Sequence, residues 1–238
     1  MSKISGFTLI ELLVVIATIA LLLAMLMPAL RKASDHAKSI KCLSNLKQIG
    51  LAAHLYAETF DGFIPRGSWG DEPIWFRVFF PFLGYDERVE DWTDIDIYRC
   101  PSYPIFGDSL NGLPNQENAV CFVINGWGYN GADIHYPTKL VNVRKPGEKI
   151  YLADNETGFW RPVITGESSE GFWWCDIFHT GHLPMSDDTD LINGRRIARD
   201  RHGRGCNCLF FDWHAENRVA EEMTEFDWHD GGPMFDDD

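Results

Sequence analysis

Basic residues are scarce in this chain of 238 residues. It carries 21 Lys and Arg against 35 Asp and Glu, which gives a formal net charge of −14. Because contacts with a phosphate backbone need a surplus of positive charge, this balance argues against nucleic acid as a partner. The sequence has no internal repeat and no low-complexity linker, which excludes a repeat protein, and its 9 Trp, 16 Phe and 7 Tyr exclude a disordered polymer.

Two common hydrolase motifs, G-x-S-x-G and H-E-x-x-H, are also absent. A zinc-binding cluster is nevertheless conceivable, because two histidines and a carboxylate can hold a catalytic zinc ion. The side chains concerned are His179, His182, His202, Asp212 and His214. The first two lie in a Gly- and Pro-containing segment, not on a helix that would fix both imidazoles. We therefore expect ordinary polar or stacked histidines and a protein that is not an enzyme.

Charged residues are almost missing from the N-terminal region. From Leu12 to Leu30 there are 19 residues without a charge, which is long enough to span a bilayer. No small-x-small cleavage site follows, but Arg31 and Lys32 do, so the run predicts an anchor and not an ordinary signal peptide. Between Phe7 and Leu30, Glu11 is the single charged residue. A carboxylate in hydrocarbon costs about a few kcal/mol or more, so Glu11 is predicted to have a function.

The residues around Glu11 resemble a known motif. Gly6-Phe7-Thr8-Leu9-Ile10-Glu11 is similar to the type IV prepilin processing site, which follows a short Lys-bearing leader. The resemblance implies that residues 1–6 are a leader, that a membrane peptidase cuts between Gly6 and Phe7, and that it methylates the new Phe7 amine. It also implies that Glu11 pairs with the N-terminus of a neighbouring subunit when the helices of residues 7–30 bundle into a filament. Pro28 stands where pilins often have a proline that kinks or loosens this helix.

The resemblance also bears on orientation. By the positive-inside rule, Lys3 before the span and five basic residues between Arg31 and Lys47 would leave the bulk of the chain in the cytoplasm. The family instead implies a single-pass inner-membrane protein with a periplasmic globular part, which becomes a periplasmic or extracellular filament after assembly. The implied partners are other copies of the chain, the prepilin peptidase, an inner-membrane assembly platform and membrane lipid.

Residues 31–60 continue the helix in an amphipathic form. Apolar side chains recur at steps of three and four residues, which predicts a stripe aimed at a globular domain; they are Ile40, Leu43, Leu46, Ile49, Ala53, Tyr56 and Phe60. Gly50 and Pro28 are the weak points of this helix. Residues 7–60 would form one helix of roughly 80 Å, which Asp61-Gly62 and Pro65 end.

The remainder, residues 61–238, is predicted to be a β domain with long loops at 66–118 and 165–200. Candidate strands are Ala119–Ile124, Glu148–Asp154, Phe159–Ile164 and Asn207–Trp213. In the last of these, Leu209 and Phe211 share one face and Phe210 the other, so the strand is interior, with His202 and Asp212 satisfying backbone groups at its two ends. The acidic end, Phe226 to Asp238, is predicted to be a solvated tail. The predicted fold class is α+β, with a long N-terminal helix packed on an antiparallel sheet as in pilins.

A second resemblance covers most of the chain. Four features are similar to pilin-like proteins of Planctomycetes, Verrucomicrobia and Lentisphaerae, which are usually labelled type II secretion major-pseudopilin-like. They are the segment Ile40–Leu51, the Cys100-Pro101-Ser102 tripeptide, the segment Lys145–Asp154 and the spacing His202-x9-Asp212. The chain departs from that pattern at Trp213, where the family has Gly. Because Trp disfavours the positive φ that Gly tolerates, we expect a different turn there.

The resemblance also implies roles for cysteines and acidic residues. Cys42 and Cys100 recur together in the family and are therefore the first disulfide pair to expect. Cys206 and Cys208 have strand spacing, so they share one face, and each would meet Cys121, Cys175 or no partner. Zinc binding by these cysteines is not favoured, because paired C-x2-C spacing is absent. Major pseudopilins often hold calcium, so Asp154, Asn155, Glu156 and Asp212 are possible calcium ligands; no cofactor is otherwise required.

The function expected from the sequence is therefore structural: a pilin or pseudopilin subunit that assembles into a helical filament for type II secretion or a type IV pilus. Two alternatives stay open. One is the zinc hydrolase, and the other is a membrane-tethered carbohydrate-binding module that uses exposed tryptophans, among them Trp69, Trp75, Trp92, Trp127, Trp173 and Trp174.

Overall fold

The computed structural model describes residues 8–65, 75–86, 95–103, 120–127, 138–156, 176–177, 180–187 and 194–229. Several predictions of the sequence fall outside these ranges. They concern Gly6, Phe7, Cys175, His179, the strand Phe159–Ile164, four of the six named tryptophans and the last nine residues of the chain.

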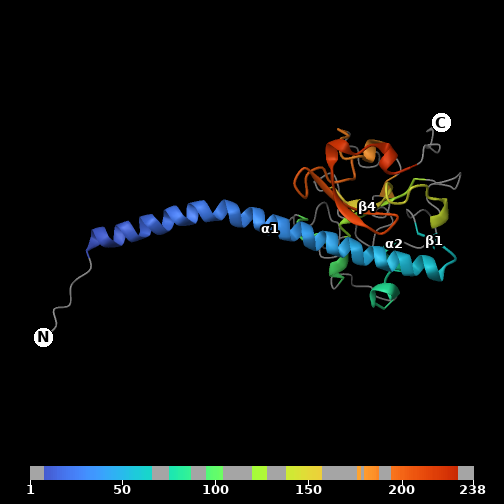
Figure 1. The fold of residues 1–238 in the computed structure, drawn as a ribbon, viewed down its shortest axis with the longest axis horizontal. Coiled ribbons are helices and arrows are strands. Elements are labelled where there is room, and N and C mark those ends of the chain that lie inside the picture. Colours follow the sequence, from blue (N-terminus) through green and yellow to red (C-terminus); the bar gives the residue numbers. More distant parts are fainter. Residues whose placement is uncertain are drawn as a thin grey trace, which may run out of the picture.

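The N-terminal helix α1 runs without interruption from Leu9 to Thr59. This confirms the predicted helix in the part of it that the structure describes. Pro28 lies inside α1 and does not end it. Figure 1 shows a gently curved helix whose N-terminal half projects from the domain, while its C-terminal half lies along it. The predicted α+β fold class is confirmed.

A five-stranded sheet forms the domain, in the order β5-β2-β4-β6-β7. Its strands are β2 (Phe122–Asn125), β4 (Ile150–Asp154), β5 (Asp176–Ile177), β6 (Gly205–Phe210) and β7 (Ala215–Val219). All neighbours are antiparallel except β2 and β5. Strands β2, β4 and β6 confirm three predicted strands with shifted ends, whereas β5 and β7 were not predicted. The two-stranded sheet formed by β1 (Phe63–Ile64) and β3 (Thr138–Lys139) was not predicted either.

The connections contain short helices. Besides α2 (Trp75–Val78), these are the 3₁₀ turns η1 (Pro81–Leu83), η3 (Asp96–Tyr98), η5 (Leu140–Asn142), η7 (Thr180–His182), η8 (Ala220–Glu222) and η9 (Glu225–Asp227). The aromatic side chains of Trp75, Phe76 and Tyr98 pack edge to face below α1. This predicted loop region therefore supplies part of the core.

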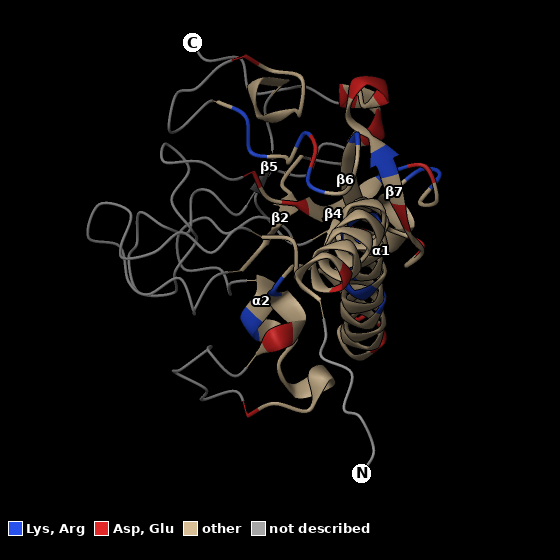
Figure 2. Ribbon diagram, turned by 90° about the vertical axis from the view of Figure 1, so that its left-hand side faces the viewer, with Lys and Arg blue, Asp and Glu red and all other residues tan. Residues whose placement is uncertain are grey.

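The C-terminal half of α1 packs against β6 and β7 (Figure 2). Its buried residues are Cys42, Asn45, Leu46, Ile49, Gly50, Ala52, Ala53 and Ala57. The predicted stripe is right in its centre and wrong at its ends, because Ile40 and Phe60 are exposed. Gly50 allows the closest approach: a Cβ atom there would lie 2.9 Å from Cδ1 of Leu209.

Strand β6 is interior, as predicted. All six of its residues are buried. Leu209 and, just beyond the strand, Phe211 belong to the core beneath α1. On the opposite face, Cys206, Cys208 and Phe210 pack with a second cluster that includes Trp127, Ile197 and Trp228.

The expectation for Trp213 is wrong, because this residue does adopt a left-handed backbone with φ of 70°. Its amide donates to the Phe210 carbonyl at 3.0 Å, and its indole packs against Tyr151 and His54 at centroid distances of 5.7 and 6.3 Å. A left-handed non-glycine residue costs about 1–2 kcal/mol. Contacts with the helix and the sheet hold Trp213 in this conformation.

The predicted solvated tail is also wrong in its first part. Trp228 is fully buried and His229 is 4% exposed. Asp227 caps the turn at Thr224 and pairs with Arg218 at 2.9 Å. Hydrophobic burial of Trp228 thus outweighs the acidic composition of its neighbours, and residues 226–229 belong to the domain.

Candidate functional site

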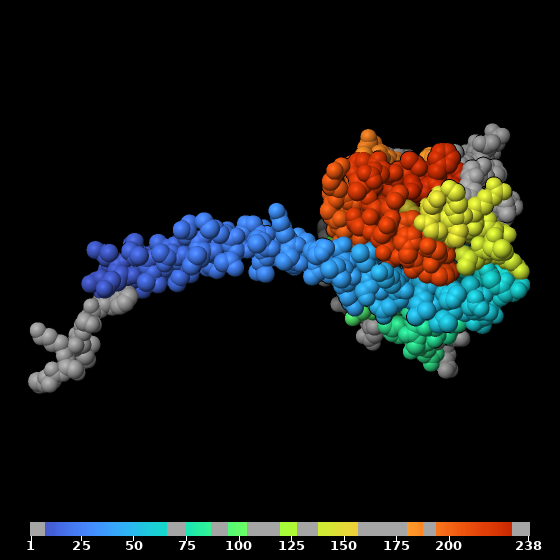
Figure 3. Space-filling view, in the orientation of Figure 1, coloured from blue at the N-terminus to red at the C-terminus, as the bar shows by residue number. Residues whose placement is uncertain are grey.

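The projecting half of α1 is the first candidate site. Every residue from Thr8 to Lys38 is exposed, including large apolar side chains on all sides of the helix. Figure 3 shows this half standing clear of the domain. Within the described part of the chain, α1 is the one helix long and apolar enough to cross a membrane, judged by length and composition. It is therefore compatible with a single membrane span.

Glu11 has a role within its own chain that the sequence reasoning missed. The amide and the hydroxyl of Thr8 each donate to Oε2 of Glu11 at 2.8 Å, and the Glu11 amide donates to Oγ1 of Thr8 at 3.3 Å. This is a capping box, in which two free amide groups at the helix start gain acceptors. The spacing Thr-x-x-Glu was the signal that could have revealed it. The carboxylate also lies at the positive end of the helix dipole.

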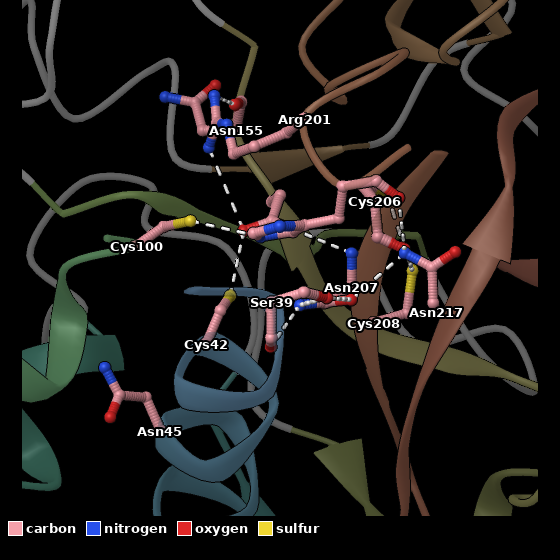
Figure 4. Close-up of polar contacts among 12 residues, drawn as sticks. Ser39, Cys42, Asn45, Cys100, Asn155, Arg201, Cys206, Asn207, Cys208 and Asn217 are labelled. Atoms are coloured by element: carbon pink, nitrogen blue, oxygen red, sulfur yellow. Dashed lines mark hydrogen bonds and ion pairs between the residues drawn. The ribbon is translucent and has the colours of Figure 1, made fainter. Parts of the chain in front are cut away.

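A buried polar cluster at the junction of helix and sheet is the second candidate site. It combines Cys42 of α1, Cys100 after η3, Asp154 at the end of β4 and His202 in the turn before β6. One potential ligand atom from each lies within 4.8 Å of all the others. Figure 4 shows the sulfur atoms of Cys42 and Cys100 directed towards the same point. Sequence separation conceals this group, because the four residues lie on four different segments.

The contacts within the cluster are short. Sγ of Cys42 lies 3.4 Å from Oδ1 of Asp154, and Sγ of Cys100 lies 3.2 Å from Nε2 of His202. The same Nε2 atom is 3.4 Å from Oδ2 of Asp154. The side chains of Asp154 and His202 are 0% and 1% exposed.

A second layer of groups holds Asp154 in place. The Asn207 amide donates to Oδ2 of Asp154 at 2.7 Å, and Nη1 of Arg201 lies 3.8 Å from Oδ1. Arg201 also donates to the Asn155 carbonyl oxygen and stacks over the Tyr103 ring at 4.6 Å. The Asn207 side chain donates to the Ser39 carbonyl oxygen of α1 at 3.1 Å. The carboxylate is therefore oriented from both sides.

Proton affinities in the cluster are shifted. Burial raises the pKa of Asp154 to about 6, and the neighbouring Cys100 sulfur adds to this shift. The hydrogen bond from Cys42 lowers the pKa of Cys100 to about 4, with further contributions from His202 and Arg201. The same bond raises the pKa of Cys42.

The cluster differs from a nucleophilic triad. In such a triad the base contacts the nucleophile through one ring nitrogen and the orienting carboxylate through the other. Here Nε2 of His202 faces both Cys100 and Asp154, while Nδ1 is buried and has no hydrogen-bond partner among the described residues. Cys100 is 3% exposed, which leaves a substrate no access to its sulfur.

The predicted disulfide and the predicted calcium ligands fare differently. Cys42 and Cys100 are free thiols in this structure, and they lie close together, so their disulfide stays a prediction. The four oxygen ligands proposed for calcium do not converge. Glu156 pairs with Arg195 at 2.6 Å, and Asp212 lies beyond the other end of β6, where it contacts His214 at 2.5 Å. Asp154 faces two sulfur atoms and an imidazole, which are not ligands that calcium prefers.

The described members of the cluster imagined for a hydrolase are not assembled either, and His179 lies outside the described residues. His202 and the pair Asp212–His214 lie at opposite ends of β6. The backbone role expected for Asp212 is confirmed, since its Oδ1 accepts from the His214 amide at 3.1 Å. That expected for His202 is wrong, because its imidazole faces Cys100 and Asp154. Of the tryptophans named for carbohydrate binding, Trp75 and Trp127 are buried and cannot form an exposed platform.

Comparison with known protein families gives a match to part of the chain. Residues 31–94 match the family described as "Protein of unknown function (DUF1559)", over less than half of the chain. Neither the curated proteins nor the solved structures contain a match. The family match fits a pilin-like protein. It begins after the apolar run, so it leaves the processing motif and Glu11 untested.

Proposed function

We propose that this chain is a pilin-like structural subunit, processed at Gly6–Phe7, which assembles into a filament by packing its N-terminal helices. The observation that carries the proposal is the projecting half of α1, whose apolar side chains are exposed around the whole circumference from Leu9 to Leu30. A helix that is apolar on all sides is stable in contact with lipid or with other helices, and not with water. A membrane before assembly and a helical bundle after assembly supply these two environments in turn.

The ends of α1 support the same proposal. Its C-terminal half is fixed to the sheet, so the helix presents the domain at a defined angle to whatever holds the apolar half. At the other end, the capping box directs the Glu11 carboxylate to the start of the helix. After cleavage, Phe7 would be the first residue of the chain and would carry the charged amine directly before Thr8 in the sequence. In a filament, the Glu11 carboxylate of one subunit would pair with the amine of a neighbour, because an opposite charge offsets the cost of desolvation.

The partners and location follow from this role. The subunit would enter the inner membrane through residues 7–30, with its domain in the periplasm, and would meet the prepilin peptidase and an assembly platform there. A pseudopilus of type II secretion and a type IV pilus are the two filaments that this architecture suits. No catalytic activity is part of the proposal.

N-terminal processing tests the proposal directly. We expect intact mass and N-terminal sequencing of protein from its native membrane to show a chain that begins at N-methylated Phe7. The variant Gly6→Leu should remain full-length, membrane-bound and unassembled, whereas the control Ser2→Leu, at the far end of the leader, should be processed normally. A mature chain that begins near Arg31 would show an ordinary signal peptide and overturn the proposal.

A further inference from the structure

We infer that Cys42, Cys100, Asp154 and His202 form a structural zinc site that joins α1 to the sheet. This inference does not depend on the proposed filament, since it rests on the domain alone. The four side chains come from four separate segments, yet their ligand atoms lie within 4.8 Å of one another.

Distances between the ligand atoms suit a tetrahedral ion. With zinc–sulfur distances of about 2.3 Å and zinc–nitrogen or zinc–oxygen distances of about 2.0–2.2 Å, neighbouring ligands of a tetrahedron lie roughly 3.3–3.8 Å apart. Sγ of Cys100 and Nε2 of His202 are 3.2 Å apart. The two oxygens of Asp154 divide the other contacts, since Oδ1 lies 3.4 Å from Sγ of Cys42 and Oδ2 lies 3.4 Å from Nε2 of His202. One of these oxygens would turn to the ion. All four residues offer a ligand atom within 4.8 Å of the others, so side-chain movements without a change of the fold would bring them to these distances.

Hydrogen bonds between the neutral imidazole and the thiols do not satisfy every contact in this arrangement. Nε2 of His202 faces both Cys100 and Asp154, and a neutral imidazole nitrogen either donates or accepts, but does not do both. If Nε2 donates to Asp154, the Cys100 thiol loses it as an acceptor. If it accepts from Cys100, its lone pair faces a carboxylate oxygen. A cation at the centre interacts favourably with all four atoms at once.

The donor set selects the metal. Two thiolates, an imidazole and a carboxylate suit zinc, whereas calcium takes six to eight oxygen ligands. Two thiolates and one carboxylate carry three negative charges, which is one more than the two positive charges of Zn²⁺ neutralise. The buried guanidinium of Arg201, 3.8 Å from Asp154, offsets that charge. Four protein ligands leave no open position, so the site would be structural and not catalytic.

A disulfide between Cys42 and Cys100 is the competing arrangement. It requires the two sulfur atoms to approach to about 2.05 Å, and it uses only two of the four converging side chains. Zinc and the disulfide exclude each other, because both use the same two sulfur atoms.

Metal analysis of the full chain, purified in detergent without chelators, tests the site. We expect one zinc per chain by elemental analysis and native mass spectrometry. Replacement by Co²⁺ should give the thiolate charge-transfer absorption and the intense visible bands of a tetrahedral centre. His202→Ala and Cys42→Ser should lose the metal. The double control Cys206→Ser with Cys208→Ser should keep it, because these buried thiols lie on the opposite face of β6, 3.8 Å from each other.

Thermal melting separates a metal ligand from a residue that is only structural. A chelator should lower the melting temperature of the wild-type chain and leave that of His202→Ala unchanged. If the variants do not fold, the Co²⁺ spectrum of the wild-type chain still decides. Reduced protein that takes up neither Zn²⁺ nor Co²⁺, non-reducing peptide maps that show Cys42 linked to Cys100, or equal metal loss in the double control would each overturn the inference.

Discussion

The two halves of α1 are one continuous helix, yet they meet their surroundings in opposite ways. From Thr8 to Lys38 the helix is exposed on every side, whereas from Ser39 onwards it buries one face against the sheet. The projecting half carries Leu, Ile, Val and Met around its circumference. The packed half buries mainly small or polar residues, among them Asn45, Gly50, Ala53 and Ala57.

This difference shows what each half is shaped to contact. Small residues let the backbone of α1 approach the sheet closely, and Asn45 donates to the Arg99 carbonyl oxygen at 3.0 Å, which fixes the helix to one connection. The large apolar side chains of the projecting half are removed from water only when an apolar partner surrounds them. One half is therefore specified by its own domain, and for the other half we propose lipid or neighbouring subunits as the apolar partner.

The largest expected effect comes from the charge at the tip of the projecting half. Glu11→Val removes a carboxylate from an apolar helix, so it should insert into membranes at least as well as the wild-type chain. We expect it to form no ordered filaments, because the partner of the neighbouring N-terminus is gone. Electron microscopy of membrane-derived assemblies measures this, and the melting temperature of the domain should not change.

Glu11→Gln is the matched control for this variant. Gln also completes a capping box, so it keeps the bonds with Thr8 and removes only the charge. If charge pairing drives assembly, Gln should fail as Val does. Normal filaments from Glu11→Gln would assign Glu11 to helix capping alone.

In the packed half, the next largest effect is expected at Gly50. A Cβ atom there would lie 2.9 Å from Cδ1 of Leu209 and 3.4 Å from the Trp213 backbone oxygen. Gly50→Val should therefore lower the free energy of unfolding by about 1–3 kcal/mol, as overpacking does. Lys47→Val, on the exposed side of α1, should cost only a few tenths of that. Helix propensity alone would favour Val over Gly, so an unchanged or increased stability of Gly50→Val would contradict the packing argument.

The long helix and the interior strands could be predicted because each depends on a local pattern. Period-3.6 spacing marked the packed half of α1, and adjacent apolar residues marked both faces of β6. Strand β7 escaped prediction because only Val219 in it is strongly β-forming, and its pairing with β6 supplies the rest. The acidic residues around Trp228 are typical of a tail, whereas the burial of this single large aromatic side chain decides the structure of the segment.

The buried cluster could not be predicted as a group. Cys42 and Cys100 were paired through a family resemblance, and His202 was linked in sequence with Asp212, which the fold places at the far end of β6. Asp154 joins the cluster because β4 and β6 are antiparallel neighbours, which brings it to the Asn207 amide. Pairing of strands sets this neighbourhood, and no spacing along the chain encodes it.

Trp213 offers a smaller test, at the contact between the packed half and the sheet. Ala and Gly both remove the indole, so their difference isolates the positive φ of 70°. We expect Trp213→Gly to be more stable than Trp213→Ala by about 1 kcal/mol, because only Gly adopts this backbone without strain. Denaturant unfolding measures the difference. At Glu216 in β7 the order should reverse, since Ala is there the better strand residue; the same order at both positions would refute the strain argument.

The smallest effect is expected at Pro28, in the projecting half. Proline supplies no amide to the Ala24 carbonyl, so Pro28→Ala should restore one helical bond and slow hydrogen exchange in the neighbouring turns. The first buried residue of α1, Cys42, lies about four turns further along the helix. Helix stabilisation at this distance does not reach the packed core, so the melting temperature of the domain should stay the same. A clear shift of that temperature would show that the two halves are coupled, and the comparison between a free half and a fixed half would fail.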